Sequence, residues 1–137
     1  MVEVVCTSLE EAIVQKISLL MEAEAEFAAG RYRFQAKRII QGREWLLCSL
    51  EVDPLPVSSR ERRAAANQAS IYLLPEEMPA FSTALWRYPI PFPTNFSQAQ
   101  TAVQGMLCIQ LKTTEPPEDF AKRLSQALKQ LNSQAAS

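Results

Sequence analysis

Arg31–Lys37 reads RYRFQAK, and its apolar and polar side chains alternate without a break. This period of two is typical of a strand with one buried face. Turn residues at Gln41–Arg43 separate it from a second run, Glu44–Asp53, whose even positions are apolar and which Pro54 ends. The two runs therefore predict an antiparallel hairpin. The side chains that we expect to face the core from the second run are Leu46, Cys48, Leu50 and Val52.

The outer side of this predicted hairpin is basic, because Arg31, Arg33 and Lys37 occupy its outward positions. Charge is also unevenly divided along the chain. Residues 1–30 hold six glutamates and one lysine, whereas residues 31–63 hold seven arginines and one lysine against four acidic residues. The basic side could bind an anionic partner, or it could lie beside the acidic first element of the fold. We favour the second interpretation, because surface charge pairs of this kind are ordinary and carry little energy.

Three stretches place apolar side chains at helical spacing. The first begins at a cap formed by Thr7 or Ser8, continues through Phe27 and ends at Gly30. The second starts at Pro75, which with the following carboxylates suits the free amides of a helix start. We expect the second helix over residues 75–88, a third over 117–132, a short basic helix over 60–66, and further strands over 69–74 and 106–111.

This order of elements predicts a single α+β domain over residues 1–137. Its two layers are a mainly antiparallel sheet of four or five strands and three helices packed against that sheet. Residues 2–6 could add an edge strand, and residues 132–137 are expected to fray as a tail. Residues 106–111 are apolar without alternation, which predicts a central strand buried on both faces.

The chemistry open to this chain is restricted by the residues that it lacks. It has no histidine and only three glycines, so the commonest general base and metal ligand is missing and a phosphate-binding glycine loop cannot be built. Cys6, Cys48 and Cys108 lie far apart within apolar runs, as buried small hydrophobic residues do. We therefore expect no catalytic residue, no cofactor and no metal site, and a protein that is not an enzyme.

Length and hydropathy give a further expectation about location. The longest apolar stretches fall well short of the ~20 residues that span a bilayer, and no positive charge precedes an apolar run at the N-terminus. We expect no membrane insertion and a cytoplasmic protein.

Aromatic and apolar side chains gather in the stretch that follows the second predicted helix. Three prolines, Pro89, Pro91 and Pro93, keep this stretch extended and out of the middle of a sheet. It could dock a partner, since such side chains are enriched at interface centres, or it could cover one edge of the core. The candidate partner-binding residues are Trp86, Arg87, Tyr88, Ile90, Phe92 and Phe96.

Two functions from different classes follow. The first is a non-catalytic protein-binding module that serves as an accessory subunit, assembly factor or regulator of a larger complex, acting through the proline-rich strip 88–96 and an exposed sheet face. The alternative is a single-stranded nucleic-acid binder, less favoured because Tyr32 and Phe34 point away from the arginines and the pI is near 5.5. The oligomeric state is left open. The candidate nucleic-acid residues are Arg31, Arg33, Lys37, Arg60, Arg62 and Arg63.

Overall fold

The computed structural model describes residues 11–54, 64–87 and 95–135 of the chain. Its elements are, in order, α1 (Glu11–Met21), β1 (Ala25–Ala28), β2 (Arg31–Ile40), β3 (Arg43–Pro54), β4 (Ala65–Leu73), a 3-10 turn η1 (Pro75–Glu77), α2 (Met78–Arg87), β5 (Ser97–Val103), β6 (Met106–Glu115) and α3 (Pro117–Ala135). The predicted edge strand at residues 2–6 and most of the predicted helix at 60–66 lie outside the described residues.

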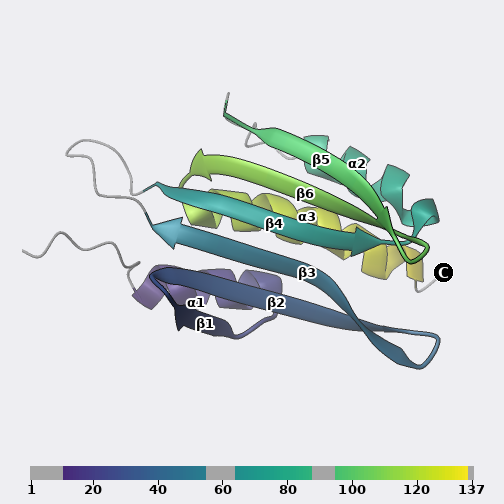
Figure 1. Cartoon of the computed structure of the whole chain (residues 1–137), viewed down its shortest axis with the longest axis horizontal. Coiled ribbons are helices and arrows are strands. Elements are labelled where there is room, and N and C mark those ends of the chain that lie inside the picture. Colours follow the sequence, from purple (N-terminus) through teal and green to yellow (C-terminus); the bar gives the residue numbers. More distant parts are fainter. Residues whose placement is uncertain (1–10, 55–63, 88–94, 136–137) are drawn as a thin grey trace, which may run out of the picture.

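The described strands form one antiparallel sheet in the order β1-β2-β3-β4-β6-β5. Figure 1 shows α1, α2 and α3 on the same face of this sheet, so the protein has two layers. The predicted α+β architecture is confirmed, with six strands rather than four or five. The opposite face carries no helix of the described chain, and we call it the open face.

The core lies between the sheet and the helices. Alternate residues of the inner strands are buried, as the period of two requires, and Phe34, Leu50 and Ile71 are fully buried. Helix α3 supplies an apolar stripe at helical spacing, with Phe120 and Leu124 fully buried. It packs against both α1 and α2, which places the three helices over one hydrophobic core.

The first helix is shorter than the sequence predicts. It ends at Met21, and Glu22 adopts a left-handed conformation with φ of 53°. The apolar side chain expected at its end, Phe27, instead belongs to β1, which pairs with β2. The prediction of one helix up to Gly30 was wrong because the free edge of β2 offers backbone hydrogen bonds that helical spacing does not reveal.

Three other boundaries differ from expectation. Ala65 and Ala66 begin β4 instead of ending a short helix, and α3 extends to Ala135, beyond the predicted helix end at residue 132. Strand β5 was not predicted at all. Its sequence SQAQTAV is small and polar and all of it is exposed, so no apolar alternation marks it as a strand.

A bulge at Ala36/Lys37 bends the β2–β3 hairpin. The register with β3 shifts there, so Leu46 lies opposite Lys37 and faces the open side instead of the core. Beyond the bulge β3 leaves β4, because these two strands pair only from Cys48 to Pro54 of β3. Figure 1 shows the end of the hairpin turning away from the neighbouring strands.

Arg38 connects the diverging end of the hairpin to strand β4 and to η1. Its Nη2 donates to the backbone oxygen of Tyr72 at 3.2 Å, and its two terminal nitrogens bind both carboxylate oxygens of Glu77 at 2.7 and 2.8 Å. Glu77 Oε1 also accepts from the amide of Leu74 at 2.8 Å. These hydrogen bonds hold the pKa of Glu77 below its usual range, despite the desolvation of the carboxyl, which acts to raise it.

Candidate protein-binding surface

An aromatic pair stands at the end of α2, where the sequence places its candidate docking residues. The rings of Trp86 and Phe96 meet edge to face with centroids 5.3 Å apart. Phe96 packs against the core, whereas Trp86 remains 55% exposed and Arg87 beside it is also exposed. The structure thus brings three of the six predicted docking residues together. The other three, Tyr88, Ile90 and Phe92, lie outside the described residues.

Strand β5 begins directly after Phe96 and forms one edge of the sheet. All seven of its residues are exposed, and it carries neither a charge nor a proline. Its register with β6 runs from Ser97 opposite Lys112 to Val103 opposite Met106 without a shift. Edge strands in soluble proteins are usually shortened, charged, kinked or covered, and β5 shows none of the first three features.

The open face is polar over most of its area. One row across five strands consists of Gln35, Ser49, Ser70, Gln110 and Ala99, which are cross-strand partners in that order. Figure 1 shows this face toward the viewer, with all helices behind it. A hollow of about 250 Å³ at the end near Arg31 and Asp53 has Lys112 and Asn95 in its lining. Two cations and two carboxylates line it, so its charges already balance one another.

Apolar side chains gather at the opposite end of the open face, on β4, β5 and β6. We call this group the apolar end. Its most exposed member is Val103, at 42%. Met106 and Cys108 are buried there although no described helix covers them. The apolar end comprises Tyr72, Val103, Met106 and Cys108, whereas Ile39 and Leu46 lie on the diverging hairpin beside the ion pair of Lys37 and Glu44.

The basic side of the hairpin is paired with acidic residues across the strands. Arg33 lies 3.4 Å from Glu51, and the corresponding distances for Arg31–Asp53 and Lys37–Glu44 are both 3.8 Å. The ion-pair partners therefore come from the neighbouring strand β3, while the acidic first segment of the chain also lies beside the hairpin, because β1 pairs with β2 and Glu26 is the cross-strand partner of Arg33. Arg60, Arg62 and Arg63 lie outside the described residues.

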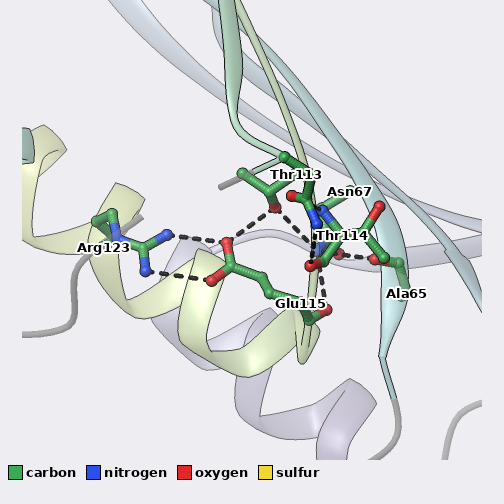
Figure 2. Close-up of polar contacts among 7 residues, drawn as sticks. Ala65, Asn67, Thr113, Thr114, Glu115 and Arg123 are labelled. Atoms are coloured by element: carbon green, nitrogen blue, oxygen red, sulfur yellow. Dashed lines mark hydrogen bonds and ion pairs between the residues drawn. The ribbon is translucent and has the colours of Figure 1, made fainter. Parts of the chain in front are cut away.

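A buried ion pair joins the end of β6 to α3. Arg123 is fully buried and binds Glu115 with two hydrogen bonds, at 2.9 and 3.1 Å. Figure 2 shows the Thr113 hydroxyl donating to the same carboxylate, at 2.8 Å. The Asn67 amide then donates to the Thr113 hydroxyl and to the Glu115 backbone oxygen, at 3.3 and 3.1 Å. Sequence analysis did not single out this group, because its members lie up to 56 positions apart along the chain.

This buried group positions α3 rather than offering a reactive centre. The Glu115 carboxylate is occupied by Arg123 and Thr113, and no described cavity opens on the ion pair. Among the described residues, no cluster of three or more acidic or cysteine side chains could hold a metal ion. Cys48 is fully buried, and this burial raises the pKa of its thiol to about 12, so it stays protonated and unreactive.

Comparisons with known proteins found no match for this chain. No family model matches it, and neither the curated proteins nor the solved structures contain a match. None of the described helices has both the length and the apolar character needed to cross a bilayer. Function therefore has to be argued from the surface described above.

Proposed function

We propose that this protein is a non-catalytic protein-binding module, an accessory subunit, assembly factor or regulator that works in the cytoplasm. The observation that carries the proposal is the aromatic pair. Trp86 presents a large ring to solvent while Phe96 fixes its orientation, with Arg87 alongside. Trp and Arg are the residue types most enriched at the centres of protein interfaces, and a ring that is already fixed loses little conformational entropy on binding.

The open face supports the same proposal. The apolar end exposes Val103 on the same sheet face as Tyr72, Met106 and Cys108, and no described helix covers this face. Exposed apolar groups that share one face are typical of interaction surfaces, whereas isolated ones need no explanation. The described residues also assemble no nucleophile with a base, which leaves binding as the activity that this surface supports.

A selection from a displayed library of random peptides tests the proposal without knowledge of the natural partner. Wild-type protein should enrich a defined set of peptides, and Trp86→Ala should bind them at least ~10-fold more weakly, as truncation of an interface anchor does. Phe27→Ala is the matched control, because Phe27 is 56% exposed and packs on Tyr32 with centroids 4.6 Å apart. Equal loss in both variants, or no enrichment by the wild type, would contradict the proposal.

The nucleic-acid alternative stays a prediction of the sequence. The cross-strand ion pairs leave Arg31 and Arg33 less free to bind phosphates than the sequence suggests. A titration with labelled oligo-dT tests whether the protein binds nucleic acid, because such binding to single strands weakens steeply as the salt concentration rises. Salt-dependent affinity that is lost in an Arg31→Glu/Arg33→Glu variant would favour this alternative over protein binding.

A further inference from the structure

We propose that strand β5 is the part of this surface that holds the partner, by accepting an extended segment of a partner protein as a seventh strand of the sheet. This inference rests on the proposed protein-binding function and names the kind of partner that the surface takes. It requires a free backbone edge, side chains that do not repel an incoming strand, and specific contacts beside that edge. The structure supplies each of these.

The backbone edge is long enough, and no other strand of the described residues pairs with it. Strand β5 uses one side of its backbone to pair with β6, and the order of the sheet leaves its other side without a strand. In such a strand the remaining N–H and C=O groups point outward and can pair with another chain. Seven exposed residues without a register shift match the length of ordinary strands in globular proteins. Strand addition of this type gives affinity through main-chain hydrogen bonds.

The opposite edge of the same sheet, strand β1, differs from β5 in both length and charge. Strand β1 has only four residues and includes Glu26, with Glu22 and Glu24 just before it. A short, charged edge is a common way to prevent strand addition. The two edges of one sheet are therefore unlike, and only β5 among the described strands suits an added strand.

Side chains on either side of β5 indicate the chemistry of the incoming segment. Gln98 and Gln100 face the helix side, where the exposed Trp86 ring stands next to the start of the strand. A large apolar side chain of the added strand can reach that ring, since neighbouring strands lie about 4.8 Å apart.

Charge at the same end favours an acidic residue in the partner. Arg87 ends α2 beside Trp86, and Lys112 lies opposite Ser97 on the open face. Both cations are exposed, and neither forms an ion pair within the described part of the chain. Strand β5 itself is uncharged, so Arg87 sets the local potential on the helix side of its start, whereas Lys112 shares the hollow on the open face with Arg31, Glu51 and Asp53. We expect an extended, apolar segment with an acidic residue near its contact with the start of β5.

The test compares two glutamine-to-lysine substitutions on adjacent strands. Gln100→Lys places a charge on the edge strand, whereas Gln110→Lys places the same charge at an exposed position of β6, inside the sheet. Peptides enriched from the random library should bind Gln100→Lys at least ~10-fold more weakly than the wild type and should bind Gln110→Lys with unchanged affinity. Their sequences should contain Asp or Glu, and Arg87→Glu should remove that preference.

Hydrogen exchange adds a measurement that only strand addition would change. Bound peptide should slow the exchange of β5 backbone amides and leave the amides of β1 unchanged. If Trp86→Ala weakens binding but Gln100→Lys does not, the protein-binding function stands and strand addition is wrong. If no peptide is enriched, both are wrong. If the wild type sediments as a dimer and Gln100→Lys as a monomer, the occupant is a second copy of this chain, which overturns the assignment to a different partner.

Discussion

Removing either side chain of the buried Glu115–Arg123 pair should destabilise the protein more than any surface change. Arg123 is fully buried and Glu115 is 7% exposed, so neither charge can be solvated by water if its partner is lost. An unpaired buried charge costs about 3–5 kcal/mol. Since about 1.4 kcal/mol corresponds to a factor of ten, Arg123→Met should lower the folding equilibrium constant by roughly 100-fold to 4,000-fold.

The pair also predicts how the two substitutions combine. Glu115→Gln alone removes the charged group that accepts two hydrogen bonds from the buried Arg123 guanidinium, and Arg123→Met alone leaves the Glu115 carboxylate with the Thr113 hydroxyl as its remaining partner in this group. The double variant Glu115→Gln/Arg123→Met contains neither charge. We therefore expect it to be more stable than either single variant, because replacement of a buried ion pair by neutral groups is often close to neutral.

Urea unfolding followed by tryptophan fluorescence and circular dichroism measures these free energies. Arg31→Met is the matched control, because Arg31 lies 3.8 Å from Asp53 with both side chains 51% exposed. It should cost no more than about 1 kcal/mol. The reasoning would be refuted if Arg123→Met cost as little as Arg31→Met, or if the double variant showed the sum of the two single losses.

Three further predictions concern the Arg38–Glu77 contact, the buried thiol and a hairpin turn. Glu77→Gln should cost about 1.5–3 kcal/mol, the usual value of hydrogen bonds to a charged group. Because folding lowers the pKa of Glu77, the wild type should also lose stability as the pH falls through that pKa, and urea midpoints from pH 7 to pH 3 should fall less steeply in the variant. Folding raises the pKa of Cys48 to about 12 from the ordinary 9.0, so its contribution to stability should decline as the pH rises above 9; a Cys48→Ala variant with an equally steep alkaline loss would contradict this. Gly42 has φ of 79° in the turn between β2 and β3, and Gly42→Ala should cost about 1–2 kcal/mol in a thermal melt, whereas an unchanged melting temperature would show that the turn relaxes.

Short-range patterns predicted the main elements of this fold correctly. The alternation of Arg31–Lys37 gave β2, and helical spacing gave α2 and α3, because burial of one face imposes a period on the sequence. The class of the fold followed from the order of these elements. The sequence predicted that Trp86 and Phe96 belong to one docking region, because they lie in the same aromatic stretch. It did not predict that their rings meet edge to face.

Long-range pairing decided the rest, and it left no local signal. Strand β1 exists because the free side of β2 takes it as a partner, although its residues continue a helical pattern. The residues of β5 are mostly small or polar and all of them are exposed. No buried face therefore imposes an alternation of apolar and polar residues on this strand. The charges of Arg31 and Arg33 are balanced by residues some twenty positions away, which only the register of β2 and β3 reveals.

The sequence by itself determined which segments of this chain bury an apolar face and, through the absence of histidine, which chemistries it lacks. Only the tertiary structure decided which surfaces stay free. The order of the strands put β5 at an edge next to Trp86, and packing placed every described helix on one side of the sheet. The physical reason is that burial is recorded in local periodicity, whereas exposure of an edge or a face depends on which distant segments pair.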